Sequence, residues 1–461
     1  MLHRAILAAT LSLAPIGAPM ATDAAIARQA QAVLDATVRT DGPGAVVLIA
    51  RGDRVLLRSA RGRAQIELDV PMQPEHVFRI ASLTKIFTAA TILRLAEQGR
   101  LSVDDPLATH LPDLSAAGRV TIRQLLTHSG GIPESSAGTP GSPKRGTDRA
   151  SRMVEIGSRP LAFEPGSRWS YSNAGYILLG AVIERISGEP WPVAMQKAFF
   201  DPLRLTHTRY GDTGPIMPGR AAGYTTDDPS HAVRNVTAVD AAVPDAAGAL
   251  VSTADDLLRW MRALTQGRAI AKDRYRQMVT APDVPPAAPT RDRYGFGVYL
   301  WQIRGEPVIG HTGQIPGFAS VVAYLPEHDI TIIALANDDN FDARLMGRRL
   351  AAIAMGSPFP AVVPTTPSAE ALQALAGVYR VDETTARTLS IRDGRLYAQR
   401  GSGHAIPLQI TAAGHLHFDP DFLSYFVPVR DASGRVIALE YFPDGEGPAD
   451  MLPRIADGAR P

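Results

Sequence analysis

The spacing of apolar and polar positions near the start of the chain predicts a helix followed by paired strands. Apolar residues recur with the helical period over residues 24–37. Two short apolar runs at 44–49 and 54–59 are separated by a Gly-Asp turn, a pattern that favours a β-hairpin. A third strand is expected near Gln65. This part of the chain therefore supplies neighbouring strands to a sheet.

The middle of the chain has mainly helical periodicity. Residues 82–99 carry apolar side chains on one face until a Gln-Gly pair that favours a helix stop, so Ser82 lies at or near a helix N-terminus. Helical spacing with loops continues over 121–205, apart from a Gly, Pro and Ser-rich excursion at 135–146. Residues 252–260 open with Ser-Thr-Ala-Asp, which is similar to a capping box and predicts a further helix.

Strand periodicity returns after the helices. Residues 308–312, 319–325 and 330–335 read as three successive antiparallel strands, the last two joined by a Pro-Glu-His-Asp turn. Helices enclosed in sequence by strands at both ends indicate an α+β fold. We expect the first hairpin and this last meander to share one antiparallel sheet.

A Pro-rich segment then marks a boundary. We predict a domain at 22–356, a Pro-rich linker at 357–369 and a second domain at 370–461. In the second domain, alternating segments separated by turn dipeptides predict a small all-β barrel. The expected strands lie at 377–381, 389–392, 395–399, 406–410, 415–418, 422–430 and 436–442.

Composition excludes several classes of function. The 461 residues are 45% apolar and 20% charged, which is typical of a soluble globular protein. A net charge of +1, with arginines scattered among acids, gives no electrostatic reason to bind nucleic acid or an anionic membrane. The chain has no cysteine, which excludes disulfides, a thiolate nucleophile and Cys-ligated metal.

The first residues are typical of a secretory signal. A His-Arg pair precedes the apolar stretch 5–14, and small residues follow around Ala18 and Ala21, so we predict a signal peptide at 1–21. An ordinary amphipathic leader is the alternative. Because no long apolar run occurs elsewhere, we expect no spanning helix and an exported protein, either periplasmic or secreted.

One lysine is chemically unusual in this chain. Only four of the 47 Lys and Arg residues are lysines, and Lys85 lies three residues after Ser82. A desolvated lysine can release its proton, whereas arginine cannot. On a helix the two side chains share one face, and the helix end offers unpaired N–H groups to an oxyanion. A capping serine beside a solvated lysine has the same spacing, so both interpretations stay open on these residues alone.

Two further clusters carry candidate chemistry. Tyr171 and Asn173 lie in a Trp-Ser-Tyr-Ser-Asn-Ala-Gly-Tyr segment, where a tyrosine beside a cation can accept a proton and an amide can orient a substrate. His311, Thr312 and Gly313 lie on a predicted strand, where glycine allows close approach to the backbone. Taken singly, each cluster is better explained by a structural role, the first as a loop anchored by aromatic side chains and the second as a structural histidine on a strand.

The order of these clusters identifies a family. Ser82-x-x-Lys85, Tyr171-x-Asn173 and the His-Thr-Gly triplet at 311–313 resemble the three motifs of the serine β-lactamase and penicillin-binding-protein superfamily. Tyr-x-Asn resembles the class C β-lactamase branch, which also holds DD-peptidases, D-aminopeptidases and esterases. The resemblance covers residues 24–355 and implies the class C fold, an antiparallel sheet flanked by helices plus an all-helical part. The C-terminal strands are similar to a lipocalin-like barrel.

The resemblance also implies roles. Ser82 would be the nucleophile, with Lys85 and Tyr171 as the other catalytic residues, relaying its proton. The backbone N–H groups of Ser82 and Gln314 would form an oxyanion hole, and substrate would be bound by Asn173, His311, Thr312 and Gly313. The expected reaction is acyl transfer without a cofactor or a metal.

One departure bears on the substrate. His311 stands where class C β-lactamases usually have lysine, and a neutral imidazole holds a substrate carboxylate less strongly. We therefore expect an exported serine hydrolase of an ester or amide, with D-aminoacyl peptides and β-lactams included. The alternatives are a true class C-like β-lactamase and a penicillin-binding sensor or scaffold without turnover. The expected partner is a small-molecule or peptide substrate, and the oligomeric state is unknown.

Overall fold

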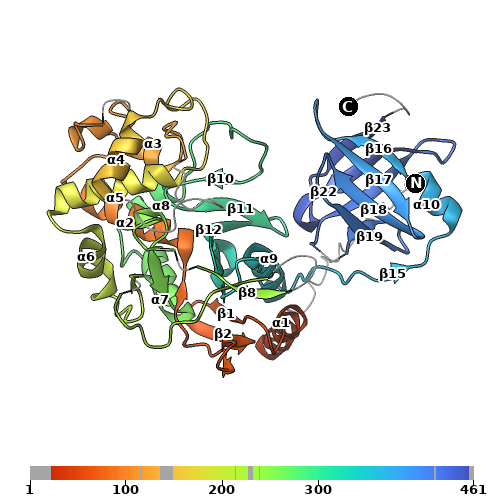
Figure 1. Cartoon of the computed structure of the whole chain (residues 1–461), viewed down its shortest axis with the longest axis horizontal. Helices are drawn as coiled ribbons and strands as arrows, with labels where there is room; N and C mark the ends of the chain where they lie inside the picture. The colour runs from red at the N-terminus through yellow and green to blue at the C-terminus, as the bar shows by residue number, and fades with distance from the viewer. Residues whose placement is uncertain are drawn as a thin grey trace, which may run out of the picture.

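The computed structural model describes residues 22–114, 117–134, 149–212, 214–226, 232–237, 239–419 and 422–455. The predicted signal peptide and the excursion at 135–146 lie outside these residues. Figure 1 shows an α+β body formed by the first three quarters of the chain and a separate β-barrel at its C-terminal end. In the described part of the chain, none of the helices combines the length and the apolar character needed to cross a bilayer.

The α+β body is built on an antiparallel sheet. Within the described residues it has seven strands in the order β10-β11-β12-β13-β14-β1-β2. The first hairpin joins the last meander through β1 and β14, with Ala45 opposite Ala336, which confirms the predicted shared sheet. The bounds are β1 Ala45–Arg51, β2 Arg54–Arg61, β10 Arg293–Tyr294, β11 Tyr299–Ile303, β12 Glu306–Ile315, β13 Phe318–Leu325 and β14 Ile330–Ala336.

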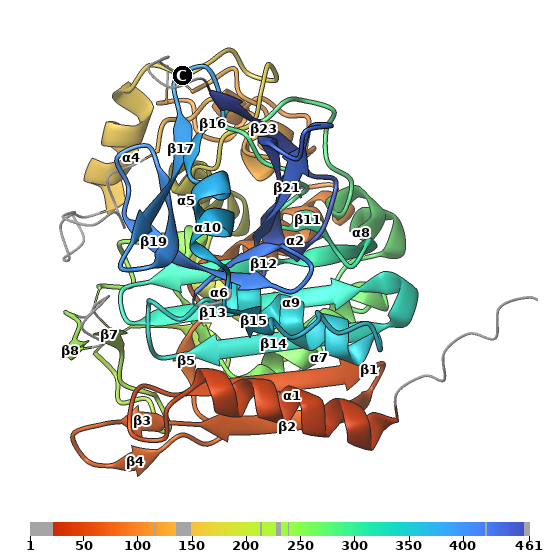
Figure 2. The same ribbon diagram turned by 90° about the vertical axis from the view of Figure 1, so that its right-hand side faces the viewer.

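Both faces of this sheet are covered. Successive residues of β1 point to opposite faces, so Val46 and Leu48 enter one apolar core while Val47 and Ile49 enter the other. Helices α1 (Asp23–Thr37) and α9 (Ala343–Ala354) cover the second face, as Figure 2 shows. This is why the strand reads as a continuous apolar run and not as an alternating one.

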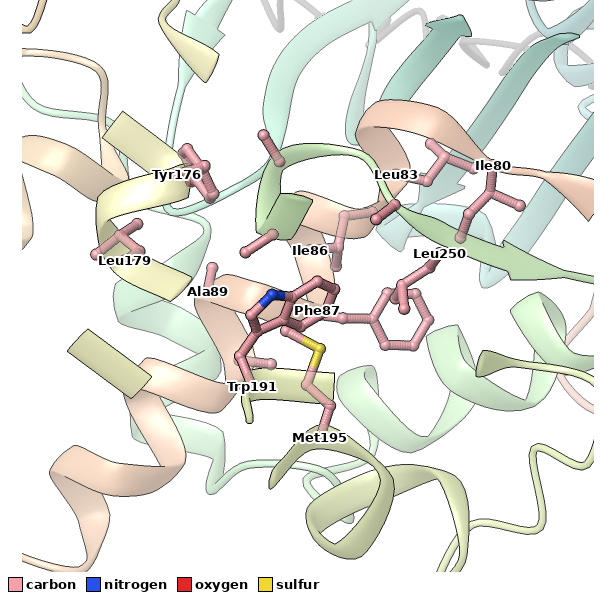
Figure 3. Packing of buried hydrophobic residues seen from close by; sticks show 14 of the residues in the cluster. Ile80, Leu83, Ile86, Phe87, Ala89, Tyr176, Leu179, Trp191, Met195 and Leu250 are labelled. Carbon is pink, nitrogen blue, oxygen red and sulfur yellow. The ribbon is translucent and has the colours of Figure 1, made fainter. Parts of the chain in front are cut away.

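The other face carries the helical part, with α2 at its centre. Helix α2 (Thr84–Glu97) is buried almost all round, and Phe87 stacks on Trp260 with ring centroids 4.2 Å apart. Figure 3 shows Phe87 packed with Trp191 and Met195 in this core. The surrounding helices are α3 Ile122–Leu126, α4 Arg149–Ser158, α5 Asn173–Ser187, α6 Trp191–Met195, α7 Ala254–Thr265 and α8 Lys272–Met278.

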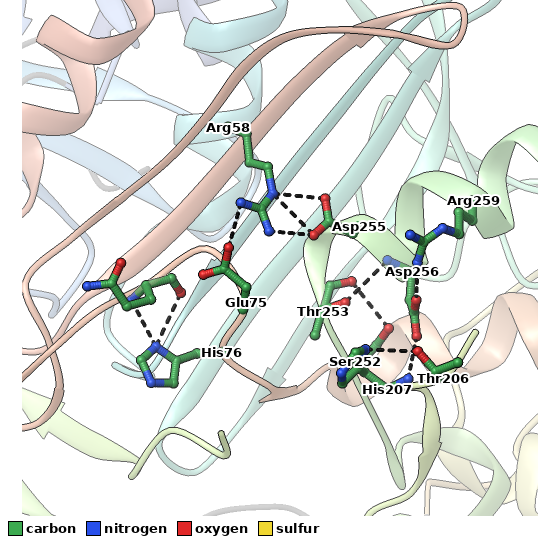
Figure 4. Close-up of polar contacts among 11 residues, drawn as sticks. Arg58, Glu75, His76, Thr206, His207, Ser252, Thr253, Asp255, Asp256 and Arg259 are labelled. Atoms are coloured by element: carbon green, nitrogen blue, oxygen red, sulfur yellow. Dashed lines mark hydrogen bonds and ion pairs between the residues drawn. The ribbon is translucent and has the colours of Figure 1, made fainter. Parts of the chain in front are cut away.

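Helix α7 is fixed by polar contacts at its first turn. Thr253 is its N-cap and accepts a hydrogen bond from the backbone N–H of Asp256, so the helix starts one residue later than a capping box at Ser252 would place it. Arg58 on β2 reaches Asp255 at 2.7 Å and Glu75 at 2.8 Å (Figure 4). These contacts attach α7 to the edge of the sheet.

Smaller sheets complete the body. The strand expected near Gln65 is β3 (Arg63–Gln65), which pairs with β4 (Val70–Pro71) instead of joining the main sheet. Strands β5 (Phe78–Arg79) and β6 (Arg209–Tyr210) both pair with β9 (Leu250–Ser252). A further hairpin joins β7 Tyr224–Thr226 and β8 Val233–Asn235.

The C-terminal strands close into the predicted barrel. Strands β16 to β23 follow one another around it, each paired with the next, and pairing between β16 and β23 closes the ring. The prediction missed helix α10 (Ala369–Leu375) and the final strand, and it began the second strand three residues late. The barrel strands are β16 Gly377–Arg380, β17 Ala386–Arg392, β18 Arg395–Arg400, β19 Ala405–Thr411, β20 Leu416–Phe418, β21 Tyr425–Arg430, β22 Val436–Phe442 and β23 Asp450–Ile455, and β15 (Pro364–Thr365) pairs outside the ring with β19.

Candidate active site

Ser82 lies on a tightly held turn between a strand and a helix. It is the middle residue of a 3₁₀ turn (Ala81–Leu83) that leads directly into α2, so the α-helix itself begins two residues after the serine. Ala81 has φ +48°, a conformation that is costly for a residue with a Cβ. Hydrogen bonds from the Ser320 hydroxyl to Ile80 O (2.9 Å) and from the Thr84 hydroxyl to Ala81 O (2.7 Å) hold this turn.

Lys85 is fully buried and points at three oxygen atoms. Its Nζ lies 3.1 Å from Ser82 Oγ, 2.7 Å from Asn173 Oδ1 and 2.7 Å from the carbonyl oxygen of Ala247. Burial lowers the pKa of Lys85 to about 7, although the charge of Glu134 opposes the shift. A neutral amine can donate to the two carbonyl oxygens and still offer its lone pair to the serine hydroxyl.

Tyr171 completes the contact around Ser82. Its hydroxyl donates to Ser82 Oγ at 2.9 Å, and Lys85 Nζ lies 4.7 Å from the centre of its ring. Burial raises the pKa of Tyr171 well above its ordinary value, so the phenol stays protonated at neutral pH. Of the two groups beside the serine, Lys85 is therefore the one able to accept a proton.

Asn173 is oriented by a carboxylate that sequence reasoning missed. Glu134 accepts hydrogen bonds from the backbone N–H of Asn173 (2.7 Å) and from its Nδ2 (3.1 Å). This leaves Oδ1 as the atom that faces Lys85. The carboxylate also lies at the N-terminus of α5, where negative charge is favourable. No spacing rule connects two residues 39 positions apart, so no sequence signal indicated Glu134.

His311 is buried and hydrogen-bonded at both nitrogens. Nε2 accepts from the Tyr294 hydroxyl at 2.9 Å, and Nδ1 donates to the carbonyl oxygen of Thr312, which can only accept. Burial, with a smaller contribution from the charge of Lys85, lowers the pKa of His311 to about 3. The imidazole is thus neutral at physiological pH. An unperturbed histidine would keep a partial positive charge there, so the positive charge at this position is lower than the sequence alone predicts.

Gly313 brings the third motif against the serine turn. A Cβ at this position would lie 2.4 Å from Ile80 O, 2.4 Å from Ser320 Oγ and 3.1 Å from the backbone nitrogen of Ser82. The glycine is therefore required for the close approach of this strand to the serine turn.

A cleft of about 310 Å³ opens beside this strand, lined by Thr312, Gly313 and Gln314 and by Arg344 across from them. Arg344 is held by two hydrogen bonds to the carboxylate of Asp292, at 2.6 and 2.9 Å. The Gln314 side chain donates to the carbonyl oxygen of Asp339 at 2.6 Å, so its amide is occupied by the protein. The structure thus brings all of the predicted site residues to one place.

An aromatic cluster explains why Lys85 is desolvated. His128 packs on Tyr171 and on Tyr294, with ring centroids 4.4 Å apart in each case, and Tyr299 stacks on Tyr171 at 6.2 Å. Of these rings, only Tyr171 was predicted from the sequence to belong to the site. His128 comes from a loop, Tyr294 from the two-residue edge strand β10 and Tyr299 from the first position of β11, where no periodicity marks them.

This fold and this convergence of three motifs define a family. Residues 24–355 match the Beta-lactamase family, and the chain belongs to it. The resemblance to the serine β-lactamases and penicillin-binding proteins found in the sequence is thereby confirmed.

Individual relatives have low sequence identity to this chain but align with it over several hundred residues. Protein flp of Staphylococcus aureus (strain N315) is 26% identical over 308 residues, which cover 64% of this chain and 59% of that protein. The D-aminopeptidase of Gluconobacter oxydans is 27% identical over 348 residues, covering 73% of this chain and 64% of the relative. The chain thus spans less than two thirds of the length of both curated relatives.

Among solved structures, the D-amino acid amidase of Ochrobactrum anthropi SV3 superposes with a TM-score of 0.64. It is 26% identical, and the alignment covers 72% of this chain and 99% of the amidase. The likeness therefore extends over nearly the whole of that enzyme.

Proposed function

We propose that this chain is a serine hydrolase that cleaves amides or esters through an acyl-enzyme on Ser82. The observation that carries the proposal is the position of Ser82 Oγ, 3.1 Å from Lys85 Nζ and 2.9 Å from the Tyr171 hydroxyl. A nucleophile in contact with a buried amine whose pKa is lowered to about 7 is the arrangement that acyl transfer needs near neutral pH.

In the proposed first step, the neutral Lys85 amine takes the Ser82 hydroxyl proton while Oγ attacks the substrate carbonyl carbon. The Tyr171 phenol then gives its proton to the leaving nitrogen or oxygen as the acyl bond breaks, and Lys85 returns a proton to Tyr171. In the second half of the reaction, water attacks the acyl-enzyme, and the same groups transfer protons in the opposite direction. This step releases the carboxylic acid product and restores the free Ser82 hydroxyl. Lys85 is the first proton acceptor because its amine can be neutral near pH 7. Tyr171 is the proton donor to the leaving group because its phenol is protonated before the reaction starts.

The remaining predicted residues take binding roles in this scheme. The backbone N–H groups of Ser82 and Gln314 would stabilise the oxyanion, since Gly313 holds the two segments in contact. Asn173 would orient the substrate amide together with Lys85. His311 would stand next to the cleft as a neutral, buried group. Thr312 would offer its hydroxyl at the cleft wall.

Within this function we favour D-aminoacyl amides or peptides with an uncharged leaving group. The D-aminopeptidase and the D-amino acid amidase support this substrate class. Among the residues that line the cleft beside Thr312, the cation is Arg344, which is neutralised by Asp292, and the neighbouring His311 carries no charge. A substrate carboxylate at this place would find no free positive partner among the described lining residues, so a neutral amide or ester fits better than a β-lactam carboxylate.

Export remains part of the proposal. It is supported by the charged, apolar and small-residue sequence of residues 1–21. Edman sequencing of protein recovered from the culture medium or periplasm would locate the cleavage. Recovery of the protein only from the cytoplasm, with Met1 retained, would contradict export.

Turnover of three chromogenic substrates tests the substrate class. We expect purified protein to hydrolyse a D-alanyl p-nitroanilide and a p-nitrophenyl ester with higher kcat/KM than a cephalosporin, and Ser82→Ala to abolish all three activities. Fast cephalosporin hydrolysis without anilide or ester turnover would identify a β-lactamase instead.

Intact mass after exposure to a penicillin separates an enzyme from a sensor. We expect a return to the free mass within minutes. A lasting adduct on Ser82 without turnover of any substrate would replace the hydrolase by a penicillin-binding sensor. Activity that survives Ser82→Ala would overturn the site itself.

A further inference from the structure

The barrel contains a buried arginine with no acidic partner. Arg387 lies on β17, faces the barrel interior and is 9% exposed. In the described part of the chain its guanidinium forms no ion pair or hydrogen bond, and its Nε is buried without a partner. A buried charge is normally paired, because an unpaired one loses its hydration without compensation.

Aromatic rings surround this guanidinium. Its central carbon lies 5.0 Å from the ring centre of Phe426, 5.3 Å from that of Tyr441 and 5.7 Å from that of Phe418. Cation–π contacts of this kind offset part of the cost of burial and fix the direction of the side chain. They satisfy none of its N–H donors, which therefore stay available to an acceptor.

A second cation lies directly beside the first. Arg387 is opposite Arg400 in the antiparallel pairing of β17 with β18, two strands that are adjacent in Figure 1. Like charges on opposed residues repel one another. Two acids of the C-terminal region are paired elsewhere: Asp419 pairs with Arg395 at 2.8 Å, and Asp444 lies 3.7 Å from Arg344 and from Arg348 of the α+β body.

The two arginines line one cavity of about 300 Å³. Its walls are mainly apolar and aromatic, with Ala398, Phe418 and Tyr441 among them, and they also include His404 and Ser424. The exposed Arg400 completes the lining. A volume of this order holds a small organic molecule. The cavity thus contains both an unpaired, planar guanidinium and aromatic surface. The guanidinium favours a ligand with an anionic end, and the aromatic surface favours a ligand with an apolar body.

We propose that the barrel cavity binds small monocarboxylates with an aromatic or branched apolar group. The carboxylate would accept hydrogen bonds from Arg387, whose planar fork matches its two oxygens, and the apolar group would lie against Phe418 and Tyr441. Arg400 would add to the attraction. This site is separate from the Ser82 centre and goes beyond the hydrolase function proposed above, on which it does not rest.

Calorimetric titration of the full chain carrying Ser82→Ala tests the site without turnover. Phenylacetate is the probe, phenylacetamide its uncharged counterpart and inorganic phosphate an anion without an apolar body. We expect one phenylacetate site, and binding of the other two compounds weaker by at least about 10-fold. Phosphate binding as tight as phenylacetate, equal affinity for the amide, or no phenylacetate binding would overturn the proposal.

Variants locate the site in the barrel. Arg387→Met should weaken phenylacetate binding about 10- to 100-fold, and Arg400→Met should weaken it less. Arg392→Met removes an exposed cation from the same strand and should leave the affinity unchanged. When Ser82 is kept, Arg387→Met should leave ester hydrolysis unchanged, because the barrel site is apart from the catalytic centre.

The variants also separate loss of binding from loss of folding. Thermal unfolding of each variant shows whether it folds. If Arg387→Met does not fold, the exposed Arg400→Met decides the test, and unchanged affinity in that variant would count against the site. Unchanged affinity in a folded Arg387→Met would exclude it.

Discussion

Glu134 holds Asn173 through two hydrogen bonds, one from the backbone N–H and one from the side-chain amide. The same carboxylate raises the pKa of Lys85 by its charge. A single acid therefore fixes the orientation of one partner of Lys85 and adjusts the basicity of the lysine itself.

Replacing Glu134 by Gln should affect both properties. We expect kcat/KM to fall about 10- to 100-fold, because one of the two hydrogen bonds to Asn173 is lost. We also expect the acid limb of the pH–kcat/KM profile to move to lower pH, because loss of the negative charge lowers the pKa of Lys85. Glu155→Gln, at an exposed position of α4, is the matched control. A fall in rate with an unmoved acid limb would show that Glu134 acts by orientation alone.

Lys85→Arg should be inactive although the charge is kept. Arginine does not release its proton in proteins, so Ser82 would lose its base. We expect kcat/KM to drop about 100- to 10,000-fold. Lys272→Arg, an exposed conservative change on α8, should retain full activity. Substantial turnover by Lys85→Arg would mean that the lysine contributes only positive charge.

The pH dependence of activity should report Lys85 and not His311. With a Lys85 pKa of about 7 and a His311 pKa of about 3, kcat/KM should rise through neutral pH as the amine loses its proton. A His311→Gln variant should keep this limb at the same pH, whatever its absolute rate. Disappearance of the limb in that variant would assign the titration to the histidine.

His311 should also lower stability in acid. Its folded pKa of about 3 lies below the unfolded value of 6.5, so the unfolded chain takes up a proton that the native state refuses as pH falls from 6.5 towards 3. In that window the wild type should lose up to about 1.4 kcal/mol per pH unit more than His311→Gln. Urea unfolding at several pH values measures the difference. Parallel pH dependences would contradict a neutral, buried imidazole.

Gly313→Ala should damage the site through the protein's own backbone. A methyl group there would meet Ile80 O and Ser320 Oγ at 2.4 Å, and the serine turn would have to move. A displacement near 1 Å can cost about 100-fold in rate. Gly42→Ala is a suitable control, because its nearest neighbour would be an ordinary 3.7 Å away. Full activity in Gly313→Ala would show that the turn tolerates the shift.

The sequence predicted the elements whose periodicity reflects their burial. Strand β1 lies between two cores, so its unbroken apolar run was readable, and so was the helical stripe of α2. The final strand β23 was missed because Pro453 within it argues against a ladder position. The start of β17 was missed because Arg387 occupies an interior position where an apolar residue is expected.

The residues of the site likewise divide into those that the sequence could reveal and those that it could not. Ser82, Lys85 and Tyr171 could be found because their order along the chain matches a known set of motifs. Glu134 and Tyr294 could not, because their contacts form only when distant loops meet. The near-neutral pKa of Lys85 likewise depends on how rings from separate segments enclose it, which no local pattern encodes.

The pairing of β1 with β14 has a consequence for how the molecule forms. Ala45 must find Ala336, so the central sheet cannot close until almost the whole α+β body has left the ribosome. The barrel strands, in contrast, mostly pair with their neighbours in sequence. Such long-range pairing slows folding and leaves apolar β1 unprotected in the meantime.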